Sequence, residues 1–146
     1  MSDETRDRDA IRHILAVYNI NGDRGRVAAL GEVFAADGVI AFSGEATYGR
    51  DAIVARLSKS ATRHPALTVS RHHITTSLID INGDNAAGRT YFQVLTDIGL
   101  DHHGHYVDRF VRTVDGWRIV HRDVRIDYQS PDSLYSRLHV RGQAPD

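Results

Sequence analysis

The sequence contains no cysteine, and this absence excludes several kinds of site. Thiol catalysis, zinc–thiolate centres and a disulfide scaffold all require that residue, and its lack fits the reducing cytoplasm, which is the predicted location. The chain also lacks an excess of charge of either sign, because 18 Lys and Arg residues are balanced by 19 Asp and Glu. A net charge of -1 excludes a strongly basic nucleic-acid-binding protein and a polybasic membrane-binding protein.

Long apolar runs are missing as well. No segment approaches the roughly 18 apolar residues of a membrane-spanning helix, and residues 1–7 lack the apolar centre of a signal peptide. The remaining composition is that of an ordinary globular protein, with 41% hydrophobic and 25% charged residues in a chain of 146. This length predicts one domain, over residues 1–130, followed by an irregular tail over residues 131–146 in which proline and glycine recur.

Histidine, by contrast, is abundant, with nine in the chain. Its side chain titrates near neutral pH and is the commonest metal ligand in proteins. The composition therefore raises two questions: whether one histidine is catalytic, and whether several of them bind a metal.

Helical patterns occupy the first half of the chain. Apolar residues recur at helical spacing from Ile11 to Tyr18, and the Asn-Gly-Asp sequence at residues 21–23 is expected to interrupt this helix. A second, shorter helix is predicted from Val27 through Phe34, ending near residues 37–38. After it come a short strand over residues 39–42 and a third helix that starts at residues 49–51 and ends before Pro65.

The second half of the chain has strand patterns. Two hairpin turns are predicted, at Asn82-Gly83-Asp84 and at Asp115-Gly116, because Asn, Asp and Gly tolerate the positive φ that tight turns need. The predicted strands cover residues 67–81, 86–95, 105–114 and 117–128. Helices followed by an antiparallel meander predict an α+β fold, in which long curved strands and a helix enclose a cup for a small apolar ligand.

His72 and His73 lie in the first of these long strands. Alternation sends one of them into the cup and the other away from it. The apolar neighbours do not decide between them, because their parity changes along the strand. A bulge between Thr75 and Ser77 would reconcile the pattern.

Asp23, Arg122 and the histidine tract allow two interpretations each. Asp23 either belongs to a site or caps the helix that follows it. Arg122, among apolar residues of the last strand, pairs either with a ligand or carboxylate in a site or with a carboxylate at the sheet edge. The tract His102-His103-x-His105 resembles a metal-binding run, but only two of its members share a strand face. We therefore predict a polar, solvated tip there, and no metal site.

The order and spacing of several short motifs over Arg6 to Tyr128 resemble the SnoaL-like proteins of the NTF2-like (cystatin-like) superfamily. These proteins form a cone-shaped α+β barrel, with N-terminal helices packed on a curved antiparallel sheet. The motifs are Asp-Arg-Asp-Ala-Ile at 7–11, Tyr18 through Asp23 to Leu30 and Phe34, Gly-Arg-Asp-Ala-Ile at 49–53, Arg71-His72, Asn-Gly-Asp-Asn-Ala at 82–86, Tyr106-x-Asp108-Arg109-Phe110, and Asp-Gly-Trp-Arg-Ile-Val-His-Arg at 115–122.

The most similar branch contains scytalone dehydratase, the bile-acid 7α-dehydratases and a dehydrochlorinase, which eliminate water or HCl with a His–Asp dyad. The resemblance places the dyad on His72 and Asp23, with His73 as the alternative base, a family Arg on Arg122 and a bile-acid dehydratase Tyr on Tyr18. Arg122 would stabilise developing negative charge or brace Asp23, and Tyr18 would donate a hydrogen bond to the substrate.

The resemblance thus implies a cofactor-independent lyase, a dehydratase acting on a small hydrophobic cyclic or polyketide-like substrate in a hydrophobic pocket. An isomerase or cyclase of the ketosteroid-isomerase type could use the same base, and a noncatalytic ligand-binding domain could keep the same fold. No cofactor or metal is expected. Family members commonly form homo-oligomers, and the close branch favours a trimer over a dimer.

Overall fold

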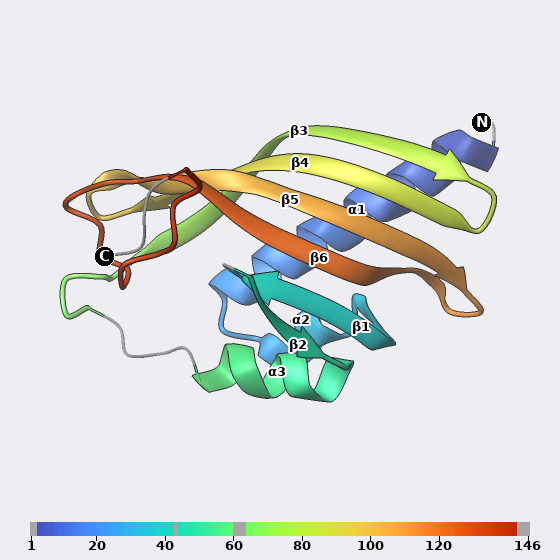
Figure 1. The fold of residues 1–146 in the computed structure, drawn as a ribbon, viewed down its shortest axis with the longest axis horizontal. Coiled ribbons are helices and arrows are strands. Elements are labelled where there is room, and N and C mark those ends of the chain that lie inside the picture. Colours follow the sequence, from blue (N-terminus) through green and yellow to red (C-terminus); the bar gives the residue numbers. More distant parts are fainter. Residues whose placement is uncertain (1–2, 43, 60–63, 143–146) are drawn as a thin grey trace.

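The computed structural model describes residues 3–42, 44–59 and 64–142. In these residues six strands form one curved sheet, and three helices accompany it (Figure 1). The strand order is β2-β1-β6-β5-β4-β3. The elements are α1 (Asp3–Asp23), α2 (Val27–Gly31), β1 (Phe34–Phe42), β2 (Glu45–Tyr48), α3 (Arg50–Lys59), β3 (Ser70–Asn82), β4 (Asn85–Thr96), β5 (Gly99–Thr113) and β6 (Gly116–Gln129). The predicted α+β class is confirmed.

Helix α1 lies along the sheet and buries one side, as its apolar spacing predicts. Ile11, Leu15 and Tyr18 from this side are at most 7% exposed and belong to the core under the long strands. Phe34, Phe92, Phe110 and Trp117 are also buried in the core, whereas Tyr91 is 51% exposed. Within the described residues, none of the helices combines the length and the apolar character needed to cross a bilayer.

The expected break of the first helix at residues 21–23 is wrong, because α1 continues through Asp23. The turn comes two residues later at Gly25, whose φ of 70° is the left-handed conformation that ends many helices. The amide of Gly25 bonds to the carbonyl of Gly22, and that of Arg26 bonds to Asn21. This paired pattern caps the helix and leaves Asp23 as its last residue.

The long second helix is also wrong. Helix α2 ends at Gly31, and Phe34 begins strand β1 instead. Phe34 and Ile40 are fully buried where β1 pairs in parallel with β6, opposite Ile119 and Arg122. The apolar spacing of residues 27–34 suits a helix, but pairing with a strand about 85 residues away outweighs that local preference. The sheet is therefore mixed, and the short strand β2 was not predicted.

The predicted hairpins and strand bulge are confirmed. β3 and β4 meet at Gly83, β5 and β6 meet at residues 114–115, and the β3 register shifts between Ile74 and Ser77. Strand β5, however, begins at Gly99 rather than at residue 105, so the histidine tract lies within the sheet. A second register shift, between Val94 and Leu95 of β4, leaves Asp101 as an extra residue of β5. This bulge determines one part of the site described below.

Candidate active site

Asp23 and His72 meet where the end of α1 faces the start of β3. Asp23 Oδ1 lies 2.6 Å from His72 Nδ1, and the backbone N–H of His72 donates to Asp23 Oδ2 at 2.9 Å. The Asp23 side chain is 6% exposed and that of His72 is 27% exposed. With Nδ1–H bound to the carboxylate, Nε2 is the ring nitrogen that can accept a proton.

Helix capping and strand register together produce this contact. The capped end of α1 places a carboxylate at a helix C-terminus, where the helix dipole disfavours negative charge. The two N–H donors of His72 compensate by binding both carboxylate oxygens. His73, next in the strand, is exposed and points to the other face. Of the two candidate bases, the structure brings His72 to Asp23.

Arg122 is fully buried, and its partner is Asp108 rather than Asp23. Nε and Nη2 donate to the two carboxylate oxygens of Asp108, each at 2.8 Å, and both side chains are 0% exposed. The guanidinium carbon also lies 4.2 Å from the ring centre of Tyr18 and 3.8 Å from that of Tyr106. Burial works to lower the pKa of Arg122, but the charge and hydrogen bonds of Asp108 outweigh it and raise that pKa. Arg122 therefore stays charged.

Tyr18 is buried beside this pair, with its ring 5.8 Å from the ring of Tyr106 in an edge-on arrangement. Burial raises the pKa of Tyr18, although the charge of Arg122 opposes the shift. The hydroxyl therefore remains protonated at neutral pH and can donate a hydrogen bond. The structure brings Tyr18 to Arg122, while Asp23 and His72 form a separate pair.

A second Asp–His pair, which the sequence reasoning missed, lies on the same face of the sheet. Asp101 Oδ1 is 2.7 Å from His102 Nδ1, and the two residues are 0% and 4% exposed. Adjacent residues of a strand normally face opposite ways, but the bulge at Asp101 turns both inward. His102 lies in one row with Val94 and His72 across β5, β4 and β3. The signal available in the sequence was an acid directly followed by a histidine, Asp101-His102.

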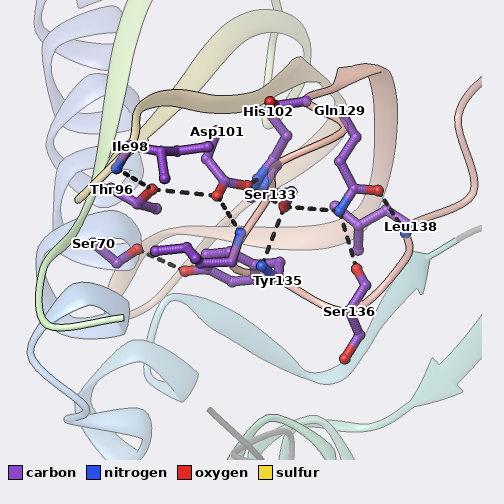
Figure 2. A network of polar contacts seen from close by, with 12 residues as sticks. Ser70, Thr96, Ile98, Asp101, His102, Gln129, Ser133, Tyr135, Ser136 and Leu138 are labelled. Atoms are coloured by element: carbon purple, nitrogen blue, oxygen red, sulfur yellow. Dashed lines mark hydrogen bonds and ion pairs between the residues drawn. The ribbon is translucent and has the colours of Figure 1, made fainter. Parts of the chain in front are cut away.

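Figure 2 shows how Asp101 organises the segment that follows β6. Its carboxylate accepts hydrogen bonds from the Ser133 hydroxyl at 2.6 Å, the Leu134 amide at 2.8 Å and the Thr96 hydroxyl at 3.2 Å. Burial alone would raise the pKa of Asp101, but the donors, with Ser133 foremost, outweigh it and lower that pKa. Burial lowers the pKa of His102 in turn, against the attraction of Asp101. The pair is therefore a carboxylate bound to a neutral imidazole.

The segment after β6 covers this second pair. The Tyr135 ring lies edge-on to His102, with centres 4.8 Å apart, and its hydroxyl is 2.6 Å from the Ser70 hydroxyl (Figure 2). Gln129 holds the segment through Ser133 and Ser136 and accepts a bond from the Leu138 amide. The described part of the predicted tail thus lacks helices and strands, apart from one bridge between Val140 and Ile126, but makes specific contacts near His72.

The prediction of a solvated histidine tip is wrong, because the tract belongs to β5 and His105 is only 2% exposed. His105 Nδ1 lies 2.7 Å from Asp127, and Arg89 lies 3.1 Å from its Nε2. His103 stacks on Tyr128. These two histidines face away from His102. Over residues 3–42, 44–59 and 64–142, no three His, Asp or Glu side chains gather as a metal site.

Two open hollows lie away from the Asp23–His72 pair. One, of about 590 Å³, is bordered by Arg89, Tyr91, His103 and His105 among others. The other, of about 420 Å³, lies between the middle of β6 and residues 139–142. Neither is lined by Asp23, His72, Arg122 or Tyr18. The apolar cup expected around these four residues remains a prediction.

Comparison with known proteins identifies relatives over most of the chain. Residues 3–123 match the family described as SnoaL-like domain. A protein of unknown function from Mycobacterium tuberculosis is 27% identical with a TM-score of 0.71, the alignment covering 87% of this chain and 80% of that one. An NTF2-like protein with a cystatin-like fold from Novosphingobium aromaticivorans is 25% identical with a TM-score of 0.72, covering 88% and 87%.

A third solved structure has a higher structural similarity but lower sequence identity. It is a candidate scytalone dehydratase from Novosphingobium aromaticivorans, with a TM-score of 0.79 over 97% of both chains and 19% identity. At that identity the likeness establishes the fold alone. No curated protein matches the chain. Together the comparisons confirm the NTF2-like fold and fit an enzyme or binder of small molecules.

Proposed function

The chain belongs to the SnoaL-like family, and from that premise we propose that it is a cofactor-independent lyase, a dehydratase acting on a small hydrophobic cyclic or polyketide-like substrate. The observation that carries the proposal is the contact between Asp23 and His72. A partly exposed imidazole, held in one tautomer by a buried carboxylate at 2.6 Å, is the arrangement that a general base requires.

In the proposed reaction, His72 Nε2 removes a proton from a carbon next to an activating group. The electron pair of the broken C–H bond forms a new C–C double bond, and the C–O bond to the leaving hydroxyl breaks. The proton on His72 then leaves with that hydroxyl as water, which restores the neutral base. Asp23 stabilises the imidazolium in between. Such proton transfer contributes roughly 10²–10⁴-fold in rate.

Tyr18 and Arg122 supply the electrostatic part of the proposal. The protonated hydroxyl of Tyr18 can donate to the activating group of the substrate. Arg122 stays charged in a buried place, where its attraction for developing negative charge is weakly screened. Two N–H groups of the Arg122 guanidinium, Nε and Nη2, donate to Asp108, so Arg122 does not brace Asp23. In this scheme Arg122 acts on the substrate instead.

The experiment is turnover of a panel of cyclic β-hydroxy ketones, followed by mass spectrometry. Dehydration removes 18 mass units, the mass of one water. We expect His72→Ala and Asp23→Asn each to lower kcat/KM by about 10²-fold or more. His73→Ala is the matched control, since that side chain lies on the other face. If both dyad variants retain the wild-type kcat/KM, the dyad is not the catalytic base.

Two other outcomes would point to the alternative functions. A product of unchanged mass would identify an isomerase or cyclase that returns the proton to another carbon. The positions of the two open hollows, away from His72, favour a noncatalytic ligand-binding domain as the second candidate. Binding of the same compounds without turnover, unchanged by His72→Ala, would support that function.

The expected homo-oligomer is part of the proposal. Family members commonly associate through the outer face of the sheet, and we propose a trimer in preference to a dimer. Light scattering coupled to size-exclusion chromatography gives the mass directly, and a mass of 16.3 kDa would show a monomer.

A further inference from the structure

Two hydrogen-bond donors beside the candidate site have no partner in the part of the chain that the structure describes. Among the residues that the structure describes, Asn19 Nδ2 and Arg122 Nη1 are the buried side-chain polar atoms that make no hydrogen bond. Leaving a buried donor unpaired destabilises the folded state, and more so for a charged group. Nearly all such groups in folded proteins are paired with protein, water or ligand. These two atoms therefore indicate where an acceptor belongs.

Asn19 is held in a fixed orientation. Its Oδ1 accepts a hydrogen bond of 3.0 Å from the Tyr106 hydroxyl, and the residue is 4% exposed. It precedes Asp23 by four positions on α1, so the two side chains lie on the same side of the helix, one turn apart. With Oδ1 bound to Tyr106, the Nδ2 amide hydrogens are the free end of the side chain.

Tyr106 connects both donors to the base. The guanidinium of Arg122 lies 3.8 Å from the ring centre of Tyr106, while Asn19 binds its hydroxyl. Phe92 stacks on the same ring with centres 4.6 Å apart, and His72 stacks near Phe92 with centres 6.3 Å apart. The free donors and the proton acceptor thus border one continuous group of aromatic rings.

We infer that Asn19 is a substrate-positioning residue, whose Nδ2–H donates with Arg122 Nη1 to a carbonyl oxygen of the substrate. The inference deepens the proposed function and rests on it. Two donors require an acceptor atom, which excludes a plain hydrocarbon as the recognised group. Arg122 already forms an ion pair with Asp108, so the site suits a neutral carbonyl, which becomes only partly negative as His72 removes the neighbouring proton, better than a full carboxylate.

The test uses two probes of the same shape, 1-tetralone and its carbonyl-free counterpart tetralin. Binding is measured by NMR titration of the wild-type protein, because neither probe carries a leaving hydroxyl that could be eliminated. The side-chain amide signal of Asn19, assigned by its loss in Asn19→Leu, should shift with tetralone and not with tetralin. One hydrogen bond of ordinary strength corresponds to about tenfold tighter binding of tetralone.

Variants separate positioning from a structural role. Asn19→Leu should abolish the preference for tetralone, whereas Asn21→Leu on the same helix should retain it, because the Asn21 side chain donates to the backbone carbonyl of Val17 within α1. Tyr106→Phe removes the hydroxyl and keeps the ring, so part of the preference should survive. A role confined to holding Tyr106 would instead make Asn19→Leu and Tyr106→Phe alike.

The inference is overturned if wild-type protein binds both probes equally. It is also overturned if neither probe, raised to the limit of its solubility, shifts the side-chain amide signal of Asn19. The latter result would mean that the donors hold a permanent water. A failure of the proposed lyase function would give a different experimental result. Probe discrimination by Asn19 with no turnover of any hydroxy ketone would leave a carbonyl-binding site without lyase activity.

Discussion

Removing the charge of Asp108 should destabilise the fold strongly, because it leaves Arg122 charged in a buried place. Both side chains are 0% exposed and share two 2.8 Å hydrogen bonds. Breaking a buried pair from one side costs about 3–5 kcal/mol. Asp108→Asn keeps one acceptor oxygen and the contacts of Arg122 with two tyrosine rings, so we expect the lower end, about 3 kcal/mol. For a chain of this size that corresponds to a fall in Tm of roughly 10 °C.

Urea unfolding followed by circular dichroism measures this change. The control is the double variant Asp108→Leu/Arg122→Met, which removes both charges and should be considerably more stable than Asp108→Leu alone. Such a result shows that the cost lies in the unpaired charge and not in the altered packing. A loss below about 1 kcal/mol for Asp108→Asn would refute the reasoning, because an exposed pair is worth no more than that.

Three further changes test other parts of the structure. Hydrogen bonds from Arg112 lower the pKa of Asp7 from 3.8 to about 2, so Asp7→Asn should reduce stability at pH 7, and in urea titrations the difference from wild type should shrink as the pH falls from about 5 and be lost only below about 2. Asp101→Asn should loosen the segment after β6 and speed tryptic cleavage after Arg137, with cleavage at wild-type rate as the contrary result. Gly104→Ala should lower Tm sharply in a thermal melt, because its Cβ would lie 1.9 Å from a β6 carbonyl oxygen.

The pairing of Asp23 with His72 was predicted through the family resemblance, because the local patterns left open both the role of Asp23 and the choice between His72 and His73. What the local patterns do predict is the strand framework that holds His72. The two hairpin turns fix the strand register by short-range chemistry, and counting back from Asn82-Gly83 places position 72 near the far end of β3. The change of parity along that strand also indicated a bulge between Thr75 and Ser77, and the register shifts there, between Ile74 and Ser77. Local turn and alternation rules carry this much of the fold, whereas the assignment of the site residues came from the resemblance.

What the sequence could not give depends on contacts between distant segments. The first part of β1, residues 34–38, was predicted as the end of a helix because its pairing with β6 has no local signature. His102 was assigned to a solvated tip because the bulge at Asp101, which turns both residues inward, arises where β5 meets β4. The partners of Asp101 at residues 133–134 add a third distant segment. Alternation alone assigns such residues to the wrong face.

The ordered segment after β6 has a consequence for the order in which the protein is made. Synthesis proceeds from the N-terminus, so Asp23 and His72 leave the ribosome long before the last donors to Asp101, the Ser133 hydroxyl and the Leu134 amide. Until those donors arrive, a carboxylate on the inner face of the sheet is only partly bound. A nascent chain can thus complete α1 and most of the sheet, but the region around His102 closes only after residues 133–134 have been made.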